Sequence, residues 1–104
     1  MAERREQNMM LQALDHVLQR YVPPFTYAIG GRSDGHICLV PDNDKWIVAF
    51  CERKQDWEAK TFSSLFTACL AFIRIVVGND KYECANDDFL QALLQNNGKR
   101  MRYE

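Results

Sequence analysis

The chain has no long hydrophobic run and no excess of charge of one sign. Its most apolar stretch, residues 65–77, is 13 residues long, whereas a transmembrane helix needs about 20 mostly apolar residues. The first ten residues lack the apolar core of a secretory signal, so we expect a cytoplasmic protein. With 13 basic and 14 acidic side chains the formal net charge is −1, which excludes the overall basic field of proteins that bind nucleic acid without sequence preference.

The cysteines lack the spacing of a metal site. Cys38, Cys51, Cys69 and Cys84 follow one another at intervals of 13, 18 and 15 positions. No CxxC pair or neighbouring histidine pair occurs, as structural zinc would require. Three of the four stand in apolar runs, where a free cysteine behaves as a small hydrophobic residue. We therefore predict buried thiols in a reducing compartment, and we expect neither a metal nor another cofactor.

A set of catalytic residues is also missing from the pattern. The two histidines are His16, on the polar side of a predicted helix, and His36, at the start of a predicted strand. Pairing of His36 with Cys38 or Cys51 as a nucleophile is conceivable, but their neighbours are apolar. The segment GGRSDG matches neither GxGxxG nor GxxxxGK[ST] and leads into a strand, so we interpret it as a hairpin turn and not as a phosphate loop. We therefore expect a protein that is not an enzyme.

The hydrophobic pattern predicts one α+β domain over residues 1–104, with a basic tail at about 99–104. Apolar residues at helical spacing up to Val22 indicate an amphipathic helix, which Pro23 and Pro24 end. Between residues 25 and 62, short extended runs alternate with the turn sequences GRSDG, PDNDK and KQD. This alternation is typical of an antiparallel meander of three or four strands.

Two helices are predicted after the strands. Residues 65–77 form a helix buried on the sheet, capped by Ser63 or Ser64 and ended by Gly78. A last helix is expected from an Asn86 cap to about Asn97, with Gly98 as its stop. Its predicted buried face consists of Phe89, Leu90, Leu93 and Leu94.

Acidic residues gather in two parts of the sequence. In the later part, Asp80, Glu83, Asp87 and Asp88, the last two would occupy the first turn of the last helix and complement its dipole. The earlier part surrounds Trp57, and tryptophan is enriched at interface hot spots, although Trp57 could instead cover a sheet edge. The candidate partner-binding residues are Asp34, Asp42, Asp44, Glu52, Asp56, Trp57 and Glu58.

Turn and core residues follow a recognisable order between residues 27 and 73. They are Gly30, Gly31, Gly35, Leu39, Trp46, Val48, Glu52, Arg53, Phe62, Ala68, Cys69 and Phe72. This order resembles small bacterial immunity proteins of polymorphic-toxin and contact-dependent growth-inhibition systems. The chain departs from the pattern at Lys54, where a glycine after Glu-Arg is usual.

The resemblance implies a cytosolic antitoxin that binds one cognate toxin domain, often a nuclease, and blocks its active site or the access of substrate. An acidic patch suits the basic active site of a nuclease and raises the association rate. We therefore expect a protein toxin as partner, neither a membrane nor direct contact with nucleic acid, and a monomer or weak dimer when the protein is unbound.

Two other functions fit the sequence. An adaptor or dimerisation module would associate through the sheet edge or the last helix. A nucleic-acid-binding module would use the basic residues of the strand region and the tail, although acidic residues are interleaved with them. These basic residues are Arg53, Lys54, Lys60, Lys99, Arg100 and Arg102.

Overall fold

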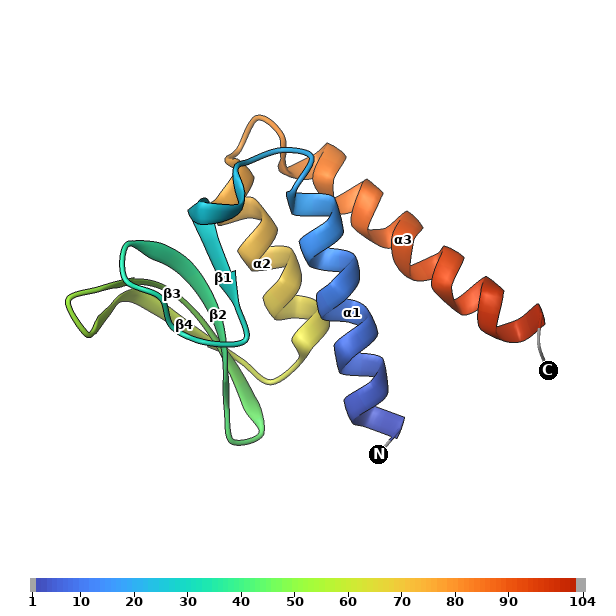
Figure 1. Ribbon diagram of the computed structural model, residues 1–104, viewed down its shortest axis with the longest axis horizontal. Coiled ribbons are helices and arrows are strands. Elements are labelled where there is room, and N and C mark those ends of the chain that lie inside the picture. Colours follow the sequence, from blue (N-terminus) through green and yellow to red (C-terminus); the bar gives the residue numbers. More distant parts are fainter. Residues whose placement is uncertain (1, 103–104) are drawn as a thin grey trace.

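The computed structural model describes the backbone of residues 2–102 and the side chains of residues 5–95, and it is an α+β fold with helices on one side of a sheet (Figure 1). The elements are α1 (Ala2–Leu18), the short 3-10 helix η1 (Pro24–Thr26), β1 (Tyr27–Ile29), β2 (His36–Asp42), β3 (Lys45–Glu52), β4 (Gln55–Phe62), α2 (Leu65–Val77) and α3 (Tyr82–Arg102). The predicted order of one helix, a sheet and two further helices is confirmed.

The sheet is mixed, so the predicted antiparallel meander is only partly right. Its order is β1-β2-β3-β4, and β1 pairs parallel to β2, with Tyr27 opposite Ile37. Parallel neighbours normally need a crossover of a dozen or more residues. Here β1 has 3 residues, about 10 Å, so residues 30–35 can lead the chain back. We call this segment the glycine loop; it is not the hairpin turn that the sequence indicated.

Helix α1 ends earlier than predicted. It stops at Leu18, and the N–H of Tyr21 bonds the carbonyl of Leu18 at 3.0 Å in a tighter turn. That turn directs the Tyr21 hydroxyl to the carboxylate of Asp88 on α3, at 2.6 Å. The hydrogen bond raises the pKa of Tyr21 to about 12. This hydrogen bond to α3 therefore fixes the position of the segment between α1 and η1.

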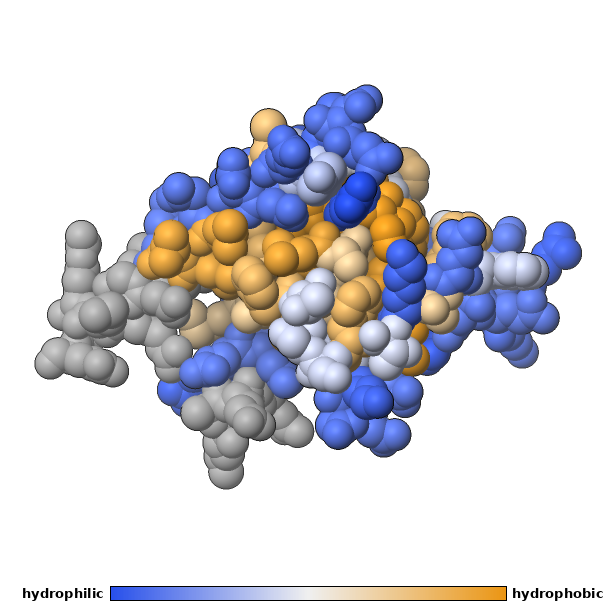
Figure 2. Space-filling view, turned by 180° about the vertical axis from the view of Figure 1, so that it is seen from behind, coloured by the Kyte–Doolittle hydropathy of each residue, from blue (hydrophilic) through white to orange (hydrophobic). Residues whose placement is uncertain are grey.

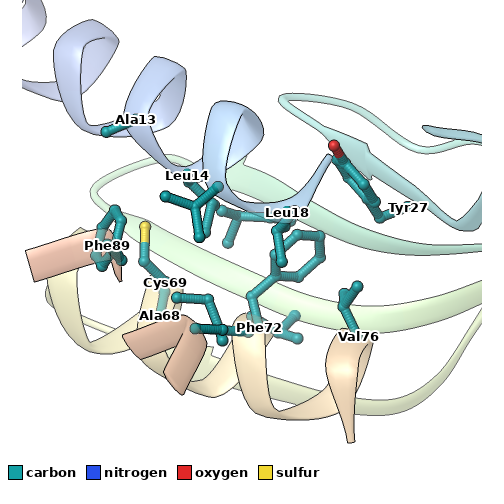
Figure 3. Close-up of a cluster of buried hydrophobic side chains, with 14 of the residues drawn as sticks. Ala13, Leu14, Leu18, Tyr27, Ala68, Cys69, Phe72, Val76 and Phe89 are labelled. Carbon is teal, nitrogen blue, oxygen red and sulfur yellow. The ribbon is translucent and has the colours of Figure 1, made fainter. Parts of the chain in front are cut away.

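The core lies between the sheet and the three helices. Leu14 and Leu18 of α1 face Cys69 and Phe72 of α2 (Figure 3). Phe72 is fully buried, and its ring meets that of Tyr27 edge to face, with centroids 6.1 Å apart. Burying such a side chain contributes about 1.5–3 kcal/mol.

The caps of α2 are those predicted. The Ser64 hydroxyl accepts a hydrogen bond from the N–H of Thr67 at 3.3 Å, and Gly78 ends the helix at φ 89°. Thr67 and Arg74 stand seven residues apart, on one side of the helix, and are exposed. Ile75 is also 44% exposed, so one apolar side chain of this helix remains open to solvent.

The boundaries predicted for the last helix are wrong. Helix α3 begins at Tyr82 and continues to Arg102, through Gly98. Tyr82 begins the helix because its N–H bonds the carbonyl of Gly78, and its ring stacks under the Arg74 guanidinium at 4.7 Å. The side-chain oxygen of Asn86 is buried and has no hydrogen-bond partner, so it is not a cap.

This shift changes the roles of several α3 side chains. Asp87 and Asp88 lie in the second turn and not the first, and Asp88 binds Tyr21 instead of complementing the dipole. Phe89 is buried as predicted, whereas Leu90 and Leu94 are 40% and 66% exposed. The side chains of the basic tail lie outside the described residues.

Candidate partner-binding site

The seven predicted partner-binding residues lie at two ends of the sheet. Asp42 and Asp44 flank the turn between β2 and β3, which we call the β2–β3 end. The others belong to the hairpin corner, defined as residues 50–60 together with the glycine loop. Asp42 pairs with Lys45 and Asp56 with Cys51, so the two groups of acids are six residues of β3 apart, about 20 Å along the strand. The acidic residues therefore do not form one patch.

The turn of the hairpin corner has an unusual backbone. Arg53 and Lys54 connect β3 to β4, and both have positive φ, 53° and 64°. Two such residues in a two-residue hairpin loop match the right-handed twist of the strands, but glycine and asparagine are preferred there. Lys54 is the position at which the resembling immunity proteins usually carry glycine, and its backbone is one that glycine adopts without strain.

Asp34 and Asp56 tie the glycine loop to this hairpin. The Asp34 carboxylate accepts a hydrogen bond from the backbone N–H of Arg53 at 2.5 Å. The Arg32 guanidinium makes a forked contact with Asp56, at 3.0 Å from Nε and 2.8 Å from Nη2. This contact lowers the pKa of Asp56. Two carboxylates predicted to bind a partner thus hold the fold of the corner.

A small second core lies beneath the glycine loop, on the sheet face away from the helices. It contains Cys38, Val40 and Cys51, with Ala28 at its border. The Cys51 thiol lies 3.4 Å from the Asp56 carboxylate, and burial raises its pKa to about 12. A nucleophilic cysteine needs a lowered pKa, so this thiol is not activated.

The histidines and the other cysteines that are candidates for catalysis are also buried, exposed or hydrogen-bonded in ways that do not form a catalytic pair. The Nδ1 atom of His36 lies 2.7 Å from the backbone carbonyl of Asp34. His16 is exposed on α1, as predicted. Cys38, Cys51 and Cys69 are buried and Cys84 is exposed, which confirms the prediction that three thiols are core residues.

A β-bulge decides which way the side chains of β4 point. Val48 pairs with Lys60 and Phe50 with Trp57, so two residues of β4 lie opposite one of β3. Glu58, in the bulge, has φ 52°. The extra residue reverses the alternation of faces. Trp57 consequently shares the helix side of the sheet with Phe50, while Asp56 shares the other side with Cys51.

Four paired residues form a row across the helix side of the sheet: Tyr27, Ile37, Phe50 and Trp57. Tyr27 is 6% exposed, Phe50 39% and Trp57 51%. Exposure rises because the helices cover the β1 side of the row and leave its β4 side open. Phe50 and Trp57, which we call the aromatic pair, are therefore cross-strand neighbours in contact with solvent.

The charges of the hairpin corner balance. Its exposed basic residues are Arg32, Arg53, Lys54 and Lys60, and its exposed acidic residues are Asp34, Glu52, Asp56 and Glu58. Basic and acidic side chains are interleaved along the hairpin, so neither an acidic patch nor a continuous basic strip forms. A cleft of about 530 Å³ separates the glycine loop from the hairpin turn.

A second apolar surface lies on α3. Leu90 and Leu94 stand one helical turn apart and are exposed. On the neighbouring helix, Phe66 stacks on Phe89 with centroids 6.1 Å apart, and Leu70 is half-buried. Figure 2 shows hydrophobic side chains gathered in a band across this side of the molecule.

Comparison with protein-family models, curated proteins and solved structures gives no match to this chain. Within residues 2–102, no helix is long and apolar enough to cross a membrane. The described side chains include no group of three or more His, Cys, Asp or Glu that could hold a metal ion.

The residues that carry the resemblance to immunity proteins are turn and core residues. Gly30 and Gly35 have φ of 92° and 76°, and both bound the glycine loop. Leu39, Val48 and Phe72 are fully buried. The core members specify the fold, while Glu52 and Arg53 are exposed at the hairpin corner, so the resemblance supports the fold more than the identity of a partner.

Proposed function

We propose that the protein is a cytoplasmic immunity protein that binds one cognate toxin domain and blocks its active site or the access of substrate to it. The observation that carries this proposal is the exposed aromatic pair on a hairpin that two contacts from the glycine loop hold in place. Tryptophan and its aromatic neighbours supply most of the binding energy at many protein interfaces. The resemblance in the middle of the chain supports a toxin as the partner.

The hairpin corner suits a docking surface because little of it has to become ordered on binding. The Arg32–Asp56 contact and the Asp34 bond to Arg53 hold the turn. An aromatic side chain loses only two rotatable bonds when it is immobilised. A pre-organised surface of this kind keeps more of its contact energy as affinity.

A nuclease toxin is the class we propose, since its phosphate-binding cleft is basic. Glu52 and Glu58 at the corner, and Asp42 and Asp44 at the β2–β3 end, form no hydrogen bond or ion pair with another described side chain. These carboxylates are available to face basic groups.

The proposal is tested by titration calorimetry with the product of the reading frame next to this gene, which the proposal expects to contain a toxin-like domain. We expect a one-to-one complex, and Trp57→Ala should weaken it by about 2–4 kcal/mol. Phe25→Ala is the matched control, because Phe25 is 74% exposed and precedes β1, three strands from Trp57. Absence of a complex at micromolar concentration would contradict the proposed function.

A second candidate is self-association through α3, which the exposure of Leu90 and Leu94 favours. Sedimentation of the pure protein distinguishes the two functions. A tight dimer that Leu94→Glu dissociates and Trp57→Ala leaves intact would favour a dimerisation module.

A further inference from the structure

Three residues around Trp57 have a backbone that their side chains disfavour. Arg53, Lys54 and Glu58 have φ of 53°, 64° and 52°. In this left-handed region the Cβ atom crowds the neighbouring carbonyl oxygen, so a residue with a side chain is strained there. Glycine has no such penalty, and asparagine only a small one. A chain selected for stability alone would carry glycine or asparagine at these positions.

The described side chains of these residues make no hydrogen bond or ion pair that would offset the strain. Within the part of the chain whose side chains are described, none of the three side chains makes a hydrogen bond or an ion pair, and all three are exposed. The contact of Arg53 with Asp34 uses its backbone N–H, which any residue except proline would supply. The fold therefore needs the backbone at these positions and not the side chains.

The opposite end of the sheet provides the contrast. Its turn also contains a residue with positive φ, Asn43 at 57°. Asparagine is several times more common in this region than other residues with a side chain. The chain thus uses a low-strain residue at the β2–β3 end and three strained, charged residues within six positions at the hairpin corner.

We propose that Arg53, Lys54 and Glu58 form the charged rim that determines which partner the aromatic pair accepts. The inference rests on the proposed function as a protein-binding domain. The partner is a protein surface with an apolar pocket for the Trp57 indole, a carboxylate opposite Arg53 and Lys54, and a basic side chain opposite Glu58.

The distances along β4 fit a rim around an anchor. Lys54 precedes Trp57 by three residues and Glu58 follows it directly, so both backbone positions lie within about 10 Å of Trp57. Residues that surround an aromatic anchor exclude water from it. Charged residues in that position determine specificity mainly by repelling partners that carry like charge there, and they add less to affinity.

The test is a double variant, Lys54→Gly with Glu58→Gly, measured for melting temperature and for affinity to the toxin-like domain encoded next to the gene. We expect the melting temperature to rise by roughly 3–6 °C, because strain is relieved. The dissociation constant should rise about tenfold or more, because the rim is lost. Asn43→Gly is the matched control and should leave the dissociation constant unchanged.

A stabilised double variant that binds as tightly as the unaltered protein would overturn the inference and leave the proposed function intact. Failure of the unaltered protein to bind would instead overturn the proposed function and the inference with it. A second variant, Lys54→Glu, keeps the backbone strain and reverses the charge. It should weaken binding without raising the melting temperature, and unchanged affinity would also contradict the inference.

Discussion

At the β2–β3 end of the sheet, Asp42 and Asp44 have no hydrogen bond or ion pair to another described side chain, whereas at the hairpin corner Asp34 and Asp56 bind groups of the chain itself. Aspartate therefore has two different roles at positions about 20 Å apart along β3. An acidic residue in a turn does not by itself indicate a partner site. Its role depends on which donor the fold brings to it.

The two ends also differ in their aromatic residues. Trp46, next to the β2–β3 turn, is 8% exposed, while Trp57 is 51% exposed. The helices cover the first and stop short of the second. The docking surface that we propose is therefore the corner and not the acidic turn.

Among variants that compare the acids of the two ends, Asp34→Ala is expected to change stability most. Loss of the carboxylate leaves the Arg53 N–H without its acceptor in a strained turn, so we expect the free energy of unfolding to fall by about 1–2 kcal/mol. Urea denaturation measures it. Asp44→Ala, the control, should change that free energy by less than about 0.5 kcal/mol. Equal effects of the two variants would mean that the acids at both ends have the same role in stability.

Charge reversal at the β2–β3 end has a smaller expected effect. Asp42→Lys with Asp44→Lys should leave the melting temperature within about 2 °C. Binding to the toxin-like domain should weaken by at most about 1 kcal/mol, mainly through a slower association rate. Stopped-flow mixing at two salt concentrations measures that rate. A loss as large as that of Trp57→Ala would move the docking surface to the acidic turn.

The smallest effect concerns pH and Asp56. Arg32 lowers the pKa of the Asp56 carboxyl in the folded protein, so the stabilisation is complete above the ordinary value of about 3.9 and is lost as the pH falls through the lowered pKa. The pair is solvent-exposed, which limits its contribution to about 1 kcal/mol or less. Urea denaturation of Asp56→Asn and the unaltered protein should differ at pH 7 and converge as the pH falls below the lowered pKa of Asp56. A constant difference would exclude the ion pair as its source.

Much of the fold follows from the sequence because strong local signals agree there. The apolar run from Leu65, the Ser64 cap and Gly78 together specify α2 as a buried helix with those boundaries. Strand β3 is apolar on both faces, which marks it as a central strand. The sequence predicts a hairpin turn for the glycine loop because glycine, serine and aspartate are typical turn residues, and the same residues also allow the short return of a parallel pair. Only the three-residue length of β1 distinguishes them.

The site was harder to predict than the fold. Strand β4 is polar on both faces, so its alternation carries no information about which side Trp57 or Asp56 takes. The bulge at Glu58 decides that, and no glycine marks it. One signal was available: Lys54 stands where the resembling proteins usually carry glycine, which points to a positive φ at the turn.

The fluorescence of Trp57 tests most directly whether the hairpin corner is the docking surface. The chain has 2 tryptophans, and Trp46→Phe leaves Trp57 as the sole tryptophan of the chain, which excitation at its red edge selects over tyrosine. Acrylamide should quench this emission efficiently in the unbound protein, because the indole is half exposed, and at least about twofold less in the complex with the toxin-like domain, because anchors are desolvated. Unchanged quenching in a complex shown to form by calorimetry would contradict the account.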